Sequence, residues 1–421
     1  MLRDRKSPMQ KIVFAGSFMI SIAGALCVAT PARAFENAKV MPMGVNRMTF
    51  RVVNTTISNK TDGAGVAQDL AKPIQKDLTF RDVLKGEKDL LKRELTAGFL
   101  LYSGVAESNS LGNFTADLEG RLTVYAPVYS RGITDRLTLA AALPIYDMSM
   151  NVGVGYQAGP GASAFRDSLT ESYNNQAEGA RDFVTKINDA VERLETKLTD
   201  NGYKRLEPWQ AKGLGDAQLV AKYAVLKDAP VNVAALGGLV LPTGRVDDPD
   251  NLIDAGFGDG QWDTFFQASV DQPLGQSGIL VNQYAKYTVQ WEDKKDVRLK
   301  TADESIEVPK KKVNYKLGDK INAGISLQYD GDSGLTTGLG YNYFQKAKDL
   351  YDAGESAEEL QKDTFQRAHE AEVSVGYSAV PAFRRQQIAV PFEINLNYKH
   401  QLASQNMPVT HFVQLETGMF F

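Results

Sequence analysis

The sequence contains three histidines, His369, His400 and His411, and they are its only imidazole groups for acid–base chemistry. The serines nearest to them in sequence are Ser374 and Ser404. A serine hydrolase needs a serine that reaches a histidine, and an acidic side chain that orients the imidazole. Neither serine has a spacing that predicts such an arrangement. We therefore expect no enzyme and keep a lipid hydrolase only as a minority hypothesis.

Another group of residues with chemical potential lies in one glycine-rich segment. It contains five aspartates: Asp247, Asp248, Asp250, Asp254 and Asp259. Carboxylate oxygens suit Ca²⁺, but the spacing of an EF-hand is absent, so a solvated acidic loop is favoured and no metal site is predicted. The only cysteine, Cys27, lies in an N-terminal apolar run. If this run is removed as part of a signal peptide, the mature chain contains no cysteine. No thiolate ligand or disulfide is then available, and we expect no cofactor.

The N-terminus has the organisation of a secretory signal peptide. Residues 1–11 are basic, Ile12 to Ala29 are apolar, and Ala32-Arg33-Ala34 fits a small-x-small cleavage site. We expect cleavage near Ala34, so that residues 35–421 form the mature protein; an uncleaved anchor is the less favoured alternative. The net charge of −4 and mean hydropathy of −0.29 argue against a nucleic-acid partner.

The C-terminal segment, residues 408–421, alternates between apolar and polar side chains. Val413, Leu415 and Met419 share one parity, whereas Gln414 and Glu416 share the other. A period of two predicts a strand with one apolar face. A strand that ends the chain on two phenylalanines is similar to the closing strand of bacterial outer-membrane barrels. That resemblance implies two partners, outer-membrane lipid and the barrel-assembly machinery that binds the terminal strand.

The same alternation recurs along the chain in segments of sufficient length to cross a bilayer, for which about 9–11 tilted residues are enough. Twelve segments are predicted: residues 45–58, 116–128, 137–156, 214–225, 231–241, 261–272, 278–292, 318–329, 334–344, 369–380, 386–400 and 408–421. Short turns near residues 133, 227, 273, 331 and 384 alternate with long loops. This is typical of barrels with short periplasmic turns. The sequence therefore predicts an all-β fold, an antiparallel transmembrane β-barrel of about 12 strands.

Two long insertions, at about residues 59–115 and 157–213, interrupt this rhythm, and we expect them to form helical extracellular loops. The apolar spacing of Lys88–Val105 favours a helix, although residues 95–106 also fit a strand. Gln176–Thr199 has an amphipathic helical pattern. As a lid, this helix would cover a hydrophobic entry site. Packing on the helix at Lys88–Val105 is the favoured interpretation.

Parity also predicts which side chains face lipid. Ile394 and Leu396 alternate with Glu393 and Asn395, and a charge that faces lipid near the midplane costs about 2–4 kcal/mol, so the polar set faces the lumen. The same rule gives these lumen-lining residues: Arg47, Arg51, Glu119, Arg121, Lys222, Asp263, Lys286, Glu372, Glu393, Asn395 and Glu416. Outward aromatic residues are expected to form girdles, at the outer rim (Trp262, Trp291, Tyr343 and Tyr398) and at the inner rim (Tyr223, Tyr329, Tyr377 and Phe421).

The lumen charges permit two interpretations. Opposed charges across a water-filled pore create a transverse field that sorts polar solutes. Alternatively, the charges pair within a packed lumen and hold the barrel shut, because twelve strands enclose little space. The sequence leaves both open.

Four groups of short motifs carry a family resemblance: Ser130–Leu137 followed by Leu143-Pro144, Gly213–Asp216 followed by Lys222-Tyr223, Leu241–Gly244, and Gly258–Asp263. On these motifs, Leu118 to Phe421 resembles the outer-membrane transporters of the meta-pathway of phenol degradation, which are distantly similar to the long-chain fatty-acid transporters. The resemblance implies an outer-membrane channel that passes small hydrophobic or aromatic solutes by passive diffusion. A structural or adhesive barrel that acts through its extracellular loops is the alternative.

Overall fold

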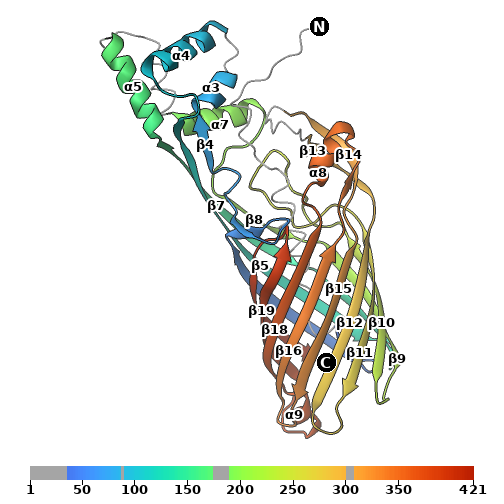
Figure 1. Ribbon diagram of the computed structural model, residues 1–421. Helices are drawn as coiled ribbons and strands as arrows, with labels where there is room; N and C mark the ends of the chain where they lie inside the picture. Colours follow the sequence, from blue (N-terminus) through green and yellow to red (C-terminus); the bar gives the residue numbers. More distant parts are fainter. Residues whose placement is uncertain (1–35, 87–89, 174–188, 300–307) are drawn as a thin grey trace.

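The computed structural model of the protein describes residues 36–86, 90–173, 189–299 and 308–421. Their largest sheet is antiparallel and closes into a barrel, with a long extension rising from one side (Figure 1), and two small sheets lie in the long connections. The predicted signal peptide, residues 1–34, lies outside the described residues. Among the helices of the described residues, none has the length and apolarity needed to cross a membrane.

The predicted count of twelve barrel strands is confirmed. Two of them are each broken once: β6 (Leu137–Ala142) continues as β7 (Ile145–Ala158), and β8 (Trp209–Leu214) continues as β9 (Ala217–Leu226). The others are unbroken: β1 (Asn46–Ile57), β5 (Ser110–Gly132), β10 (Asn232–Leu241), β11 (Asp263–Pro273), β12 (Ile279–Gln290), β15 (Lys320–Asp330), β16 (Leu335–Lys346), β18 (Gln366–Ser378), β19 (Phe392–Gln405) and β20 (His411–Phe420). The barrel closes because β1 pairs with both β20 and β5.

Short turns join the strands at one end of the barrel, and most of the long connections lie at the other (Figure 1). In the turn between β15 and β16, Gly334 has a φ of +94° and lies against the carbonyl of Ser378, where a Cβ would clash. Phe421 lies beside the start of β1, since its backbone exchanges hydrogen bonds of 2.8 and 3.0 Å with Asn46. The sorting of short and long connections agrees with the sequence prediction.

The long connections carry most of the remaining elements: β2 (Asn59–Thr61), β3 (Ala67–Asp69), β4 (Lys76–Thr79), α3 (Phe80–Gly86), α4 (Leu90–Ser103), α5 (Pro160–Tyr173), α7 (Ala190–Asp200), β13 (Asp293–Arg298), β14 (Lys310–Lys316), β17 (Leu350–Tyr351), the 3-10 helix Gly354–Ser356 and α8 (Ala357–Gln361). α4 shows that the segment left undecided by the sequence is a helix up to Ser103. α3, α4 and α5 pack together at the tip of the extension through Phe80, Leu100 and Phe165.

One predicted strand begins too early. The alternation suggested a strand from residue 386, but β19 begins at Phe392. The residues before it form the helix α9 (Val380–Arg384) and a turn in which Gln386 has a φ of +58°. Pro391 immediately precedes the strand, and a proline has no amide hydrogen to donate to a ladder. The apolar side chain of Val390 therefore belongs to the turn rather than to the lipid-facing set.

Candidate functional site

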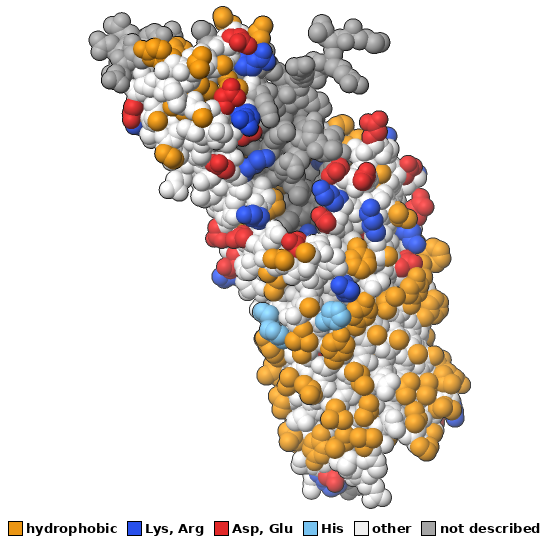
Figure 2. Space-filling view, in the orientation of Figure 1, with side chains coloured by type: hydrophobic (Ala, Val, Ile, Leu, Met, Phe, Trp, Pro, Cys, Tyr) orange, Lys and Arg blue, Asp and Glu red, His pale blue; other side chains and the backbone are white. Residues whose placement is uncertain are grey.

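The outside of the lower barrel carries a continuous apolar belt (Figure 2). Exposed side chains on its strands include Phe50, Leu219, Leu239, Phe266, Ile325, Leu339, Val373, Leu396 and Leu415. Charged side chains gather on the surface above the belt (Figure 2). An apolar band around a closed barrel is the surface of a protein that spans a membrane with strands. Of the predicted girdle residues, the structure leaves these exposed: Tyr223, Trp262, Trp291, Tyr329, Tyr377, Tyr398 and Phe421; Tyr343 is half-buried against His369.

One wall of the lumen, formed by β1, β20, β19 and β18, is charged and hydrogen-bonded. Arg47 contacts Glu393 at 2.9 Å and Glu416 at 3.3 Å, and Arg51 contacts the other oxygen of Glu416 at 3.3 Å. Arg51 and Glu416 are both almost fully buried. Two of these ion pairs join the paired strands β1 and β20, and the third reaches from β1 past β20 to β19 on the same wall.

The same wall continues on β19 and β18 with further inward-facing polar groups. Lys399 contacts Glu372 at 3.5 Å, and Asn395 is within 3.3 Å of the hydroxyl of Thr336. Asn397 is buried, and its side-chain oxygen has no hydrogen-bond partner among the described residues. Lys399 shares the parity of Glu393 on the same strand, and its buried side chain faces the lumen as that parity predicts.

The opposite wall of the lumen, on β5, β6, β9, β10 and β11, carries a cluster of apolar side chains, here called the apolar wall, among buried polar side chains that include Thr138, Gln267, Ser269 and Asp271. A buried cluster lines it: Val128, Ala140, Val220, Ala234, Leu236 and Phe265, together with Ala38. Three predicted lumen residues lie on or beside this wall. Lys222 is buried, Asp263 lies 3.7 Å from Lys320, and the Lys286 ammonium lies 4.1 Å from the centre of the Phe265 ring. The alternation could not reveal this wall, because small apolar residues occur there on both faces of the strands.

The prediction for Glu119 and Arg121 is wrong. Both face outward on β5, where they form a 2.8 Å ion pair with each other, and the Arg121 side chain is 67% exposed. Their apolar neighbours Leu118 and Leu122 are buried inside. This part of β5 rises above the apolar belt, so water rather than lipid surrounds it, and the polar face turns outward.

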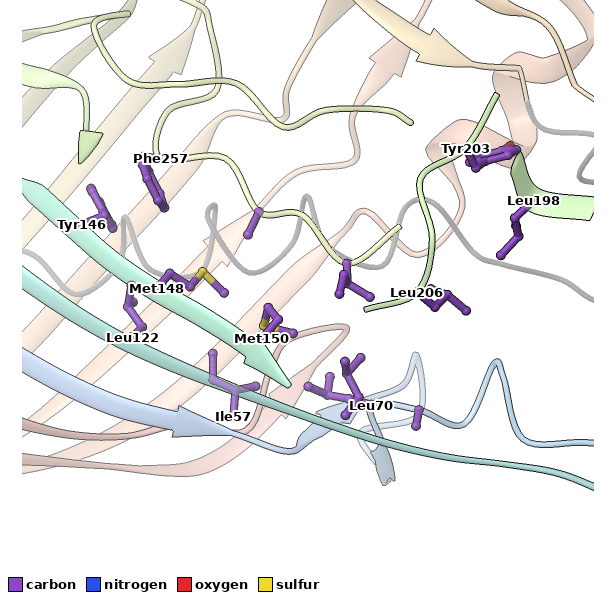
Figure 3. Close-up of a cluster of buried hydrophobic side chains, with 14 of the residues drawn as sticks. Ile57, Leu70, Leu122, Tyr146, Met148, Met150, Leu198, Tyr203, Leu206 and Phe257 are labelled. Atoms are coloured by element: carbon purple, nitrogen blue, oxygen red, sulfur yellow. The ribbon is translucent and has the colours of Figure 1, made fainter. Parts of the chain in front are cut away.

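The upper barrel interior is consequently apolar (Figure 3). Ile57, Leu122 and Met150 project into it from β1, β5 and β7. α7 packs against β7 in the extension and buries Leu194 and Leu198 in the same cluster (Figure 1). The favoured interpretation of the amphipathic segment, packing on the helix at residues 88–105, is therefore corrected for its described part, which packs on β7. The first half of that segment, residues 176–188, lies outside the described residues.

Several of the motifs that carry the family resemblance meet at the breaks in the barrel wall, whereas Ser130–Leu137 lies at the short-turn end. The Thr243 hydroxyl donates to the carbonyl of Gly215 at 2.8 Å. Asp216 accepts the amides of Gly244 at 2.9 Å and Asp259 at 3.3 Å. The loop between β10 and β11 is thereby tied to the break between β8 and β9. Residues far apart in sequence thus form one structural joint at the extracellular rim.

The aspartates of this loop pair with basic side chains. Asp254 accepts two hydrogen bonds from Arg245, at 2.6 and 2.8 Å, and lies buried. Asp250 contacts both Arg298 and Lys310 at 2.6 Å. The acidic loop is therefore a folded part of the extracellular cap, held to the β13–β14 hairpin, and is not the solvated loop that the sequence favoured.

The segment that precedes β1 enters the lumen from the short-turn end. The Lys222 ammonium donates to the Asn37 side chain at 3.1 Å. The Ala38 amide donates to Asp271 at 2.9 Å, and Asp271 also accepts from Asn282 at 2.7 Å. These buried contacts anchor the segment between the polar and the apolar wall. The alternation of the strands gives no signal for this placement.

A cavity of about 380 Å³ lies beside this segment at the short-turn end of the barrel. Its lining is mixed: Ala38, Val40, Leu226, Pro273, Ile279 and Leu280 are apolar, whereas Asp271, Asn232 and Asp330 are polar. Ala38 also belongs to the apolar cluster of the lumen wall. Ala38 of the inserted segment therefore lies between the apolar wall and this cavity.

The histidines and serines considered for hydrolysis are kept apart. Ser374 is buried with its side chain on the lumen face of β18, and Ser404 contacts the Thr61 hydroxyl at 2.9 Å. His400 and His411 are exposed on the outer surface. Neither Ser374 nor Ser404 therefore lies on the outer surface that carries His400 and His411.

The sequence matches no family model and no curated protein sequence. Among solved structures, it matches an outer-membrane channel from Pseudomonas putida F1 with a TM-score of 0.51 and 13% identity, over 93% of this chain and 100% of that chain. This likeness shows the outer-membrane barrel fold. The toluene transporter TodX of Pseudomonas putida matches with a TM-score of 0.34 and 10% identity, over 99% of this chain and 98% of that chain. The toluene transporter TbuX of Ralstonia pickettii matches with a TM-score of 0.34 and 11% identity, over 93% and 92%.

Proposed function

We propose that this protein is an outer-membrane channel through which small hydrophobic or aromatic solutes pass by diffusion. The observation that carries the proposal is the apolar wall of the lumen, with Val220, Leu236 and Phe265 buried along it. An apolar solute gains contact with these side chains, whereas an ion beside them loses hydration without a compensating hydrogen bond. The shared fold with an outer-membrane channel supports the same conclusion.

The route that we infer begins at the apolar upper interior and descends along the apolar wall to the cavity at the short-turn end. The inserted N-terminal segment occupies this route, so it must shift for a solute to pass. Its anchors are a few hydrogen bonds, to Lys222 and Asp271 among others. Each hydrogen bond to a charged group contributes about 1.5–3 kcal/mol, so displacement of the segment by thermal motion is compatible with diffusion and needs no energy source.

The test combines single-channel conductance with uptake of an aromatic solute by cells, using one variant on each wall. Leu236→Gln changes the apolar wall at similar volume and should lower aromatic uptake several-fold, with swelling of liposomes by a small sugar unchanged. Asn397→Leu on the polar wall is the matched control and should not lower aromatic uptake. Equal aromatic uptake by cells with and without the protein would overturn the proposal. Absence of conductance as well would leave the structural or adhesive barrel as the better account.

A further inference from the structure

We propose that His400 and His411 form a binding site for a divalent transition-metal ion on the outer surface of the barrel. The two residues are directly opposite each other in the antiparallel pair β19–β20. Their rings are parallel within 7°, with centroids 4.6 Å apart. Both side chains are exposed, because their neighbours Lys399 and Phe412 turn into the barrel. Two imidazoles that face the same solvent at this separation are placed to share one ligand.

The ring nitrogens of this pair are available for coordination. The Tyr398 hydroxyl lies 3.4 Å from Nδ1 of His400, which leaves Nε2 of that ring unengaged. Within the described part of the chain, the contact of His411 is its stack on His400, with no hydrogen bond or ion pair. A hydroxyl on the far nitrogen is the kind of outer contact that orients a metal-binding imidazole.

The chemistry of the donors selects the class of metal. Neutral imidazole binds Zn²⁺, Cu²⁺ and Ni²⁺, whereas Ca²⁺ and Mg²⁺ require oxygen ligands. The described residues contain no group of three or more His, Cys, Asp or Glu side chains that could hold a metal. The protein therefore supplies two ligands here, and water or headgroup oxygens complete the coordination. Bonds of about 2.0–2.1 Å draw the two nitrogens to roughly 3.3 Å, so the rings must tilt toward each other.

The position of the pair gives such an ion a structural role. The histidines lie at the upper margin of the apolar belt (Figure 2), where β19 and β20 are joined by a loop outside the membrane. β20 is also the strand that closes the barrel against β1. An ion held by both histidines would tie the last two strands together next to this seam, and any ligand that binds only the folded protein stabilises it.

The third histidine provides a matched control. His369 lies on the neighbouring strand β18, opposite Ala403 instead of His400. Its Nδ1 is within 2.6 Å of the Tyr341 hydroxyl, and its ring contacts Tyr343. It is an imidazole at the same margin that lacks an opposed partner, so its removal should leave metal binding unchanged.

The test uses the full-length protein without a histidine tag, folded in detergent micelles at neutral pH, with Cu²⁺ and Zn²⁺ as probes. Calorimetry should show one Zn²⁺ per chain, and the Cu²⁺ electron paramagnetic resonance spectrum should show two nitrogen donors. His400→Gln and His411→Gln should each lower affinity by at least about tenfold, since even an outer partner of a ligand matters by that much. His369→Gln should bind as the wild type does.

Heat-modifiable gel mobility shows that each variant is folded before binding is compared. The proposal is overturned if the wild type binds no more tightly than the double variant His400→Gln/His411→Gln. It is also overturned if the two-nitrogen spectrum persists in both single variants. If His369→Gln loses as much metal affinity as the other two single variants, the metal binds to scattered surface histidines and not to this pair.

Discussion

The lower and the upper barrel are built from the same strands, but their outer faces differ in polarity. In the lower part of β1, Phe50 faces outward and Arg51 inward; in the upper part, Asn54 faces outward and Ile57 inward. β5 shows the same inversion, from an outward Tyr129 below to an outward Arg121 above. The backbone alternation continues without interruption, and only the surroundings change from lipid to water. Side-chain parity therefore identifies two faces of a strand, whereas the solvent at each height decides which face is apolar.

The largest expected difference concerns one ion pair from each region. Glu416→Gln should destabilise the barrel by about 3–5 kcal/mol, because it leaves the buried Arg51 guanidinium without its carboxylate. Glu119→Gln removes the same type of contact from the exposed Arg121 and should cost less than about 1 kcal/mol. The temperature at which heat-modifiable mobility is lost measures both. Equal shifts for the two variants would contradict the assignment of one pair to the lumen and the other to solvent.

The next largest difference is expected when a charge is introduced on the outer surface, because it should reduce membrane assembly in the lower barrel only. Leu415→Arg places a cation on the lipid face of β20, at a cost of about 2–4 kcal/mol, and should reduce assembly into the membrane. Asn151→Arg lies on the outer face of β7, above the belt, and should assemble normally. The fraction of heat-modifiable protein in outer-membrane preparations is the measurement. Poor assembly of both variants would mean that the belt extends to the upper barrel.

The change from lipid to water outside the barrel explains which residues the sequence predicted correctly and which it did not. The twelve strands were predictable because a spanning strand must alternate wherever one face meets lipid, as Leu396 and Asn395 do. Glu119 and Arg121 were misassigned because the same rule was applied where water lies outside. No pattern in the sequence marks the height at which β5 leaves the membrane.

Other features could not be predicted from the sequence because they depend on contacts between residues far apart in the chain. The apolar wall was missed since residues such as Ala234 and Ala235 are small and apolar on both faces of β10. The inserted segment around Ala38 has no periodicity, and its place depends on Asp271, more than two hundred residues away. The joint at Asp216 was visible only as separate turn motifs, because its partners come from another loop.

A smaller effect is expected when the contacts of the inserted segment in the lower barrel are removed. Asp271→Ala leaves the Ala38 amide without its buried acceptor, at a cost of about 1–3 kcal/mol, and should increase the open probability of single channels. Asp330→Ala removes the ion pair with Lys39, whose side chains are 62% and 42% exposed, and should have little effect. Conductance recorded on planar bilayers distinguishes them. Similar gating in both variants would show that the buried hydrogen bond does not hold the segment.

The smallest expected effect is the pH response of the extracellular cap. Lys204 contacts Asp248 at 2.8 Å on the loop that carries Asp254. Burial opposes ionisation of Asp248, but the hydrogen bonds from Lys204 and from the Asp250 amide outweigh it and hold the pKa of Asp248 below its usual value of 3.8. A lowered pKa means that the folded cap prefers the carboxylate. Its contribution is therefore complete above about pH 4 and is lost as the pH falls through the lowered pKa.

Because Lys204 is largely exposed, the contribution should stay well below about 1 kcal/mol. Trp209 stacks under Arg245 at 5.4 Å and can report on the cap, if Trp262 and Trp291 are replaced by phenylalanine. We expect its emission to be constant from pH 7 to pH 5 and to change below pH 4, and Asp248→Asn to reduce that change. If Trp209 emission in Asp248→Asn changes with acid as in the wild type, another carboxylate of the cap is responsible for that change.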